Sequence, residues 1–190
     1  MKKLALALAA MMTVACFSTV SFAEETVTIN WSDVEEIVEA SGVKGSFVTL
    51  DEIAVKMWMP DDLKPMELTD EDKDAGFIAY YTNEEGDAAV SVVYADVNNM
   101  SLDEYFEYLE AADGVSDIEF GVLNGLECVT YEMKETDSAS IAFATEAGYV
   151  LEVTLAPMSD EEFAPLASFI TCSIMPEEAT EAATEGVTEG

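Results

Sequence analysis

The sequence predicts an α+β protein in which one mostly antiparallel sheet is packed between helices. In residues 77–96, two apolar and β-branched runs are joined by a short acidic loop containing Gly86, which is typical of a β-hairpin. Residues 117–156 contain four further apolar runs separated by turns. The runs at 89–95 and 149–156 are largely apolar at both odd and even positions, so both faces of each strand are apolar. We therefore expect the hairpin in the middle of the sheet and helices on both faces, which gives three layers.

The remaining strands are indicated by turn signals. Asn124 and Gly125 separate the first two of the four runs, and Asn-Gly is a strong hairpin signal because both residues tolerate positive φ. The four runs are therefore predicted to form a meander. Earlier in the chain, 45–50 and 53–59 are expected to form a strand pair, and 61–76 has no periodicity and is predicted to be a surface loop.

Three segments combine helical periodicity with a start signal. Ser32, Ser101 and Ser159 are each followed three residues later by glutamate, which is the pattern of a capping box. Pro165 lies inside the third segment and would remove a helical hydrogen bond. That helix is therefore expected to begin near Glu162 or to be kinked.

Residues 1–23 have the pattern of an export signal. Lys2 and Lys3 precede an apolar run, and small residues lie around Ala23, after which we expect cleavage. The alternative is a lipoprotein anchored at Cys16, because alanine precedes this cysteine, although threonine stands where leucine is usual. We expect a secreted bacterial protein, with lipid anchoring as the alternative.

Residues 24–175 are expected to form one domain, since this length can bury a sizeable core. Residues 176–190 repeat a small-Thr-Glu unit without aromatic residues, so we expect this tail to be disordered. After the signal, no segment approaches the roughly 20 apolar residues that a membrane-spanning helix requires. A monomer is the default expectation.

The chain is strongly acidic, with 40 Asp and Glu residues against 7 Lys and Arg, no histidine and a formal net charge of −33. Nucleic acid, anionic lipid and phosphate ligands require cations that neutralise them, so none of these is expected. A charged partner should instead be a cation or the basic surface of an envelope or extracellular protein.

The absence of histidine limits catalysis. It excludes Ser-His-Asp and Cys-His nucleophile arrangements and any histidine-ligated zinc or haem. Neither a P-loop nor a G-x-G-x-x-G fingerprint is present. A pair of carboxylates remains available for glycoside hydrolysis, but among 40 acidic residues proximity alone carries no information. We expect a non-catalytic protein without a cofactor, and a small carboxylate-dependent hydrolase is the alternative.

One acidic segment resembles a metal-binding loop. Asp70, Asp72 and Asp74 alternate along a stretch that ends at Gly76, and alternate loop carboxylates can converge on Ca²⁺. The glycine comes one position later than an EF-hand loop requires, and Lys73 opposes cation binding. A Ca²⁺ site at these three carboxylates and a solvated acidic loop are the two alternatives, of which the pattern favours the second.

Two further residue pairs have both a structural and a functional interpretation. Cys128 and Cys172 form either a disulfide, which export would permit, or two buried thiols, which their apolar neighbours favour. Trp58 and Lys56 share one face of a predicted strand and mark either a ligand surface or a tryptophan covered by a helix, such as the one that begins near Ser32.

The order of these segments resembles the PsbP-like superfamily, which includes DcrB-like bacterial envelope proteins and the photosystem accessory protein. The segments that carry the resemblance are 47–60, 100–109, 124–131, 141–157 and 159–174. The resemblance covers residues 45–175 and implies an antiparallel sheet sandwiched by helices, with a non-catalytic accessory or binding role. It supplies no active-site motif, so it assigns no functional residue.

Overall fold

The computed structural model describes residues 27–50, 53–145 and 147–177. The predicted export signal 1–23, the lipid-attachment alternative at Cys16 and the tail beyond residue 177 lie outside these ranges. None of the helices in the described ranges is long and apolar enough to cross a membrane.

The chain combines helices and strands, as the sequence predicts. The helices are α2 (Trp31–Ser41), α3 (Asp70–Asp74), α4 (Leu102–Glu110) and α5 (Phe163–Cys172). The strands are β1 (Val27–Ile29), β2 (Gly45–Leu50), β3 (Val55–Pro60), β4 (Lys64–Pro65), β5 (Phe77–Thr82), β6 (Ala89–Asp96), β7 (Val115–Leu123), β8 (Leu126–Met133), β9 (Ser138–Ala144), β10 (Tyr149–Ala156) and β11 (Met175–Pro176).

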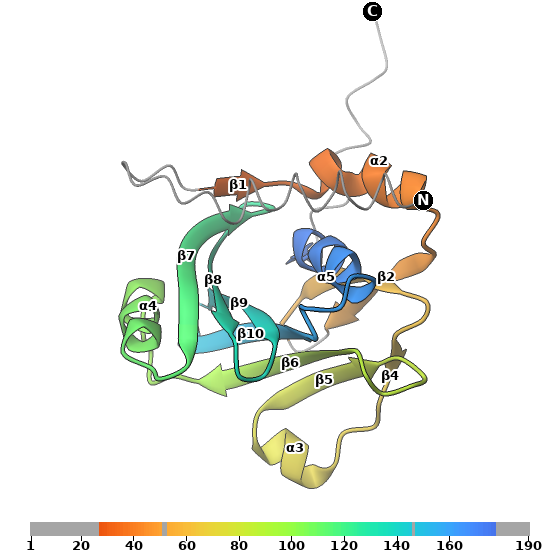
Figure 1. The fold of residues 1–190 in the computed structure, drawn as a ribbon. Coiled ribbons are helices and arrows are strands. Elements are labelled where there is room, and N and C mark those ends of the chain that lie inside the picture. The colour runs from red at the N-terminus through yellow and green to blue at the C-terminus, as the bar shows by residue number, and fades with distance from the viewer. Residues whose placement is uncertain (1–26, 51–52, 146, 178–190) are drawn as a thin grey trace, which may run out of the picture.

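The larger sheet contains eight of these strands, in the order β1-β7-β8-β9-β10-β6-β5-β4. All neighbours are antiparallel except β1 and β7, which are parallel. The four strands from β7 to β10 form the predicted meander, and the sheet curls around α5 (Figure 1). The fold is therefore α+β with a largely antiparallel sheet.

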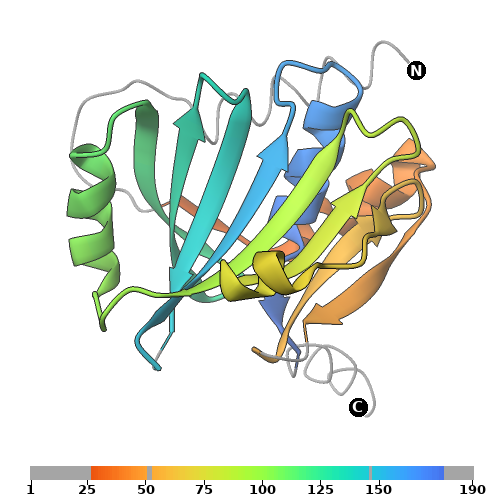
Figure 2. The same cartoon turned by 90° about the horizontal axis from the view of Figure 1, so that it is seen from below.

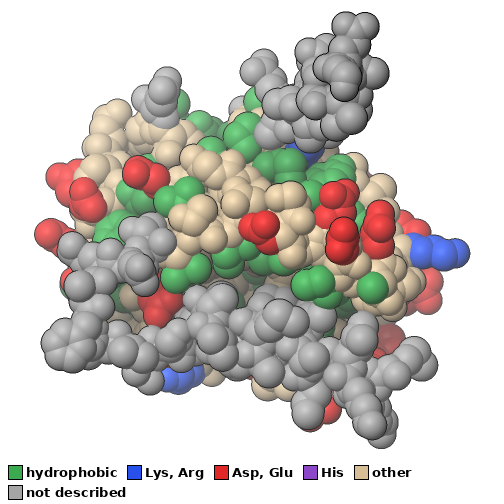
Figure 3. Space-filling model, turned by 90° about the horizontal axis from the view of Figure 1, so that it is seen from above, with side chains coloured by type: hydrophobic (Ala, Val, Ile, Leu, Met, Phe, Trp, Pro, Cys, Tyr) green, Lys and Arg blue, Asp and Glu red, His purple; other side chains and the backbone are tan. Residues whose placement is uncertain are grey.

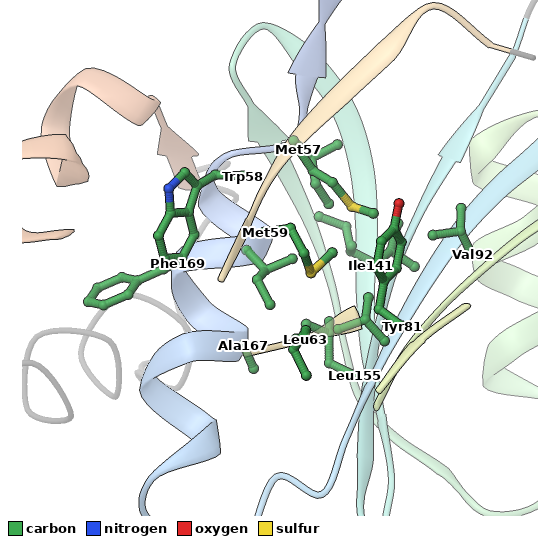
Figure 4. Packing of buried hydrophobic residues seen from close by; sticks show 14 of the residues in the cluster. Met57, Trp58, Met59, Leu63, Tyr81, Val92, Ile141, Leu155, Ala167 and Phe169 are labelled. Carbon is green, nitrogen blue, oxygen red and sulfur yellow. The ribbon is translucent and has the colours of Figure 1, made fainter. Parts of the chain in front are cut away.

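A second, smaller sheet corrects the expectation of a single one. It has the order β11-β3-β2 and lies on the concave side of the larger sheet (Figure 1). Its middle strand β3 is buried on both faces: Met57 and Met59 point toward the larger sheet, and Trp58 points toward Phe169 on α5 (Figure 4). An apolar strand signals burial, but it does not specify which sheet the strand joins.

The hairpin of β5 and β6 lies toward one end of the larger sheet, so its predicted central position is wrong. Val90 and Val92 are fully buried on the concave face, whereas Ser91 and Val93 on the opposite face are half-buried. The small and β-branched side chains on that second face tolerate partial contact with water, which explains why an apolar run did not require cover on both sides.

Helices lie on both sides of the larger sheet (Figures 1 and 2). Tyr105 and Leu109 of α4 pack with Val129 and Tyr131 on the convex face. The concave face is shared by α5 and the small sheet. The plain three-layer sandwich of helices around one sheet is therefore not confirmed.

The predicted start of α4 is present as a reciprocal cap. Ser101 Oγ accepts the Glu104 amide at 3.2 Å, and the Glu104 carboxylate accepts the Ser101 amide at 2.9 Å. The cap of α2 differs from the prediction at Ser32, because the helix begins at Trp31, directly after Asn30. Asn30 donates its amide to Asp33 at 3.2 Å, so the cap lies two residues earlier than predicted.

The third predicted capping box does not form, because α5 starts only at Phe163. The Ser159 amide instead donates to Asp137 at 3.0 Å, in the turn between β8 and β9. Pro165 is the third residue of the helix, where its missing amide removes no intrahelical bond. The expected start near Glu162 is therefore confirmed.

The segment 61–76 is not entirely loop. Lys64 and Pro65 pair with β5 as the short strand β4, and α3 follows at Asp70–Asp74. Thr69 starts α3, because its hydroxyl accepts the Asp72 amide at 3.2 Å. The helix has only five residues, too few to show a helical period in the sequence.

Candidate functional site

A groove of about 340 Å³ lies between α2 and β2. Its lining combines aromatic and acidic side chains, and six of them define its character: Trp31, Phe47, Trp58, Glu35, Glu39 and Asp61. We call this site the α2–β2 groove.

Three aromatic rings form the apolar part of the groove. The Trp31 ring lies 5.5 Å from the Phe47 ring in an edge-to-face arrangement and 6.4 Å from the Trp58 ring. Trp58 is only 6% exposed and forms the base, whereas Phe47 is 41% exposed and stands at the rim. A large, half-open aromatic surface of this kind offers both apolar contact and π faces to a ligand.

Gly45 allows the base of the groove to form. A β-carbon at this position would lie 2.4 Å from Cζ2 of Trp58 and 2.5 Å from the carbonyl oxygen of Met59. These distances are too short for any side chain, so only glycine lets the indole lie against the β2 backbone. Gly45, the first residue of β2, therefore determines the depth of the groove.

Asn124 positions Trp31, which lines the α2 side of the groove. Its side-chain oxygen accepts the Trp31 amide at 2.6 Å, and its side-chain nitrogen donates to the carbonyls of Cys172 at 2.9 Å and Ile174 at 2.7 Å. One side chain in the β7–β8 turn thus connects the start of α2 to the end of α5. The position of Trp31 depends on these contacts.

The charges of the groove favour a cation. Glu35 and Glu39 are one helical turn apart on α2, and Asp61 lies at the end of β3, whereas Lys44 is the lysine in the lining. Three carboxylates against one ammonium group leave a local excess of negative charge. Figure 3 shows the same imbalance on the upper face of the molecule, where acidic side chains greatly outnumber lysines.

Trp58 has features of both alternatives considered from the sequence, a tryptophan covered by a helix and part of a ligand surface. Trp58 is covered by Trp31 of α2 and by Phe169 of α5, whose ring lies 6.4 Å away. Its indole nevertheless lines the α2–β2 groove. Lys56 is 8% exposed, and its ammonium nitrogen lies 5.4 Å from the centre of the Phe47 ring, within cation–π range.

Asp70, Asp72 and Asp74 lie on α3, away from the groove. The Asp72 carboxylate accepts the Thr69 hydroxyl at 2.7 Å and the Thr69 amide at 2.8 Å, and these hydrogen bonds lower its pKa. In the part of the chain that the structure describes, no group of three or more Asp, Glu, His or Cys side chains is placed to hold a metal ion. Calcium binding by this segment stays a prediction.

The two cysteines are both buried. Cys128 on β8 is 3% exposed, and burial raises the pKa of its thiol to about 12. Cys172 ends α5 and is 6% exposed. A disulfide between them stays a prediction, which mass spectrometry of the alkylated, unreduced protein would test.

Two further clusters contain ionisable groups. At the irregularity in β7, burial and the nearby Asp117 carboxylate raise the pKa values of Glu119 and Glu132. Asp117 itself pairs with Lys134 at 3.4 Å, and this pair is exposed. These carboxyls do not line the α2–β2 groove.

The second cluster lies between α4 and the convex face of the larger sheet. The hydroxyls of Tyr105 and Tyr131 donate to the Glu152 carboxylate at 2.8 and 2.6 Å. Burial and the neighbouring Glu152 charge raise the pKa values of both tyrosines, so they stay protonated and donate. This network attaches α4 to the sheet.

The sequence did not single out Trp31, Phe47 or Gly45 as site residues. They meet only in the folded chain, where α2 and β2 come together. One local signal was present, because Glu35 and Glu39 are like charges four residues apart on one helix, which mildly destabilises an isolated helix.

No protein-family model matches the chain, and no curated protein matches its sequence. Among solved structures, the chain is similar to the cyanobacterial PsbP protein (CyanoP) of Synechocystis sp. PCC 6803, with a TM-score of 0.52, 12% identity, and coverage of 70% of this chain and 93% of that chain. It is also similar to the Ran-binding protein Mog1p of Saccharomyces cerevisiae, with a TM-score of 0.42, 10% identity, and coverage of 71% and 96%. The second likeness is too low to carry an argument, whereas the first confirms the PsbP-like fold that the sequence resemblance implies.

Proposed function

We propose that the chain is a non-catalytic binding module that takes a basic segment of a partner protein into the α2–β2 groove. The observation that carries this proposal is the meeting of Trp31 and Phe47 with the carboxylates of Glu35 and Glu39 in one groove. Lysine and arginine side chains combine an apolar stem with a cationic head, and such a groove offers a surface to each part.

Several features support binding over catalysis. The chain contains no histidine, and the groove lining contains neither cysteine nor serine. The net charge of −33 favours approach of a basic partner and disfavours anionic ligands.

The proposal places the partner outside the cytoplasm. Its support is the pattern of Lys2, Lys3 and the apolar run up to Ala23, which is typical of an export signal. N-terminal sequencing of the exported chain should find Glu24 as the first residue. A blocked N-terminus at Cys16 would instead support the lipid-anchored alternative.

The binding proposal is tested with a defined basic peptide. The probe is a fluorescent octapeptide of alternating valine and lysine with blocked termini, titrated with the protein and followed by fluorescence anisotropy. The paired substitution Glu35→Gln and Glu39→Gln should weaken saturable binding about fivefold, because exposed charge pairs contribute about 0.2 to 1 kcal/mol each.

The matched control removes the same charge elsewhere. Glu107→Gln with Glu110→Gln on α4 removes two carboxylates that do not line the groove, so it should change the dissociation constant less than about twofold. Equal losses in the two pairs, or no saturable binding, would show that the groove is not the site.

A further inference from the structure

The strand β2 is an edge of the small sheet, because within the described residues it pairs only with β3. Edge strands present unpaired backbone groups to other chains, and proteins usually protect them by shortness, charge or proline. The other described edges are protected: β1 has three residues, and β4 (Lys64–Pro65) and β11 (Met175–Pro176) have two residues each and contain proline. By contrast, β2 has six residues with neither a charge nor a proline.

Two hydrogen bonds show which backbone groups of β2 point outward. The Trp58 amide donates to the Ser173 hydroxyl at 2.7 Å, on the side of β3 away from β2. Trp58 faces Phe47 in the antiparallel register, so this pair exchanges no ladder hydrogen bonds. The Asp61 amide donates to the Lys44 carbonyl at 2.9 Å, so Lys44 and Asp61 are a hydrogen-bonded pair. Hydrogen-bonded and non-hydrogen-bonded pairs alternate along the ladder, so Phe47–Trp58 and Thr49–Lys56 are both non-hydrogen-bonded pairs. The amides and carbonyls of Phe47 and Thr49 therefore point to the free edge.

We propose that the basic segment of the partner binds as an added β-strand along β2. This inference rests on the proposed function and specifies its geometry. The free amides and carbonyls of Phe47 and Thr49 supply the main-chain hydrogen bonds, which is the recognition mode of strand addition. No other described edge offers a run of this length beside the α2–β2 groove.

The side chains of β2 give the expected pattern of the partner. Phe47 and Thr49 lie on the same face as Trp58 and Lys56, which are their register partners on β3. Alternate side chains of an added strand face the same way, so every second residue of the partner faces the groove side. Basic residues at alternate positions would then lie on the face of β2 where Glu35 and Asp61 line the groove together with Phe47 and Trp58.

The substitution Thr49→Pro distinguishes strand addition from binding in the groove alone. Thr49→Pro removes an outward amide while leaving the ladder bonds to β3, and proline is tolerated on edge strands when its nitrogen faces solvent. The alternating valine and lysine octapeptide should bind Thr49→Pro about tenfold more weakly than Thr49→Ala, which keeps the amide. Thermal unfolding first establishes that Thr49→Pro is folded.

Amide hydrogen exchange of the unsubstituted protein gives an independent measurement. The octapeptide should slow exchange at Phe47 and Thr49. Unchanged exchange there, or equal affinity of Thr49→Pro and Thr49→Ala, would overturn strand addition. If the Glu35 and Glu39 substitutions still weaken binding in that case, the proposed function stands without it, and if they do not, both proposals fail.

A second copy of this chain is the competing occupant of the edge. Two β2 strands pairing with each other would make a dimer, although a net charge of −33 on each copy opposes this. Analytical ultracentrifugation of the protein alone should show a monomer. A dimer that Thr49→Pro dissociates would overturn the basic partner as the occupant.

Discussion

Asn124 offers the sharpest test of the structure, because its side chain makes three hydrogen bonds that join α2, α5 and the β7–β8 turn. Asn124→Gly removes these bonds and preserves the positive φ of 50°. Each neutral hydrogen bond contributes about 0.5 to 1.5 kcal/mol, so the substitution should lower the free energy of unfolding by about 3 kcal/mol. For a chain of this size, the melting temperature should fall by about 6 to 12 °C.

Asn98→Gly is the matched control. Asn98 is exposed, has a positive φ of 57°, and uses its backbone amide in its hydrogen bond to Asp96. Both substitutions add the same flexibility to the unfolded chain, so the difference between them isolates the side-chain bonds of Asn124. Urea unfolding followed by tryptophan fluorescence measures both variants. A difference below about 0.5 kcal/mol would refute the bridging role.

Three further predictions concern the cap of α4, the acidic cluster and calcium. Ser101→Ala should lower the free energy of unfolding by about 1 kcal/mol in urea titrations, because it removes one half of the capping box. The pKa of Glu132 is raised by burial and by Asp117, so its contribution to stability is present below its unfolded pKa and is lost as pH rises through its folded pKa. Glu132→Gln should therefore raise the melting temperature at pH 7, and the gain should disappear below about pH 4; a gain that persists at low pH would contradict this. If the calcium prediction holds, millimolar Ca²⁺ but not Mg²⁺ should raise the melting temperature, and Asp72→Ala should abolish the rise; an equal rise with both ions would indicate charge screening only.

Local signals predicted much of this fold. The capping box at Ser101 and the turn at Asn124 and Gly125 both have the expected structure, because each depends on residues within one turn of chain. The position of β3 could not be predicted in this way. Its apolar residues on both faces indicate burial, but the second sheet is set by contacts with α5 and β11.

The groove was harder to predict than the fold. Trp31 and Phe47 are separated by a helix and a turn, and their contact depends on how α2 crosses β2. Asn124 was recognised as a turn residue, but its side-chain bonds to the ends of α2 and α5 depend on packing across the molecule. Sequence periodicity reports which residues are buried, and it carries little information about which buried elements meet.

The contact between Trp58 and Ser173 affects the order in which the chain can fold. These residues are separated by 115 positions, and β11 joins β3 only after α5 has been made. The small sheet therefore cannot be completed on the ribosome until the last part of the chain has emerged, and such distant contacts slow folding. A chain that ends at residue 162 should lack a cooperative thermal transition.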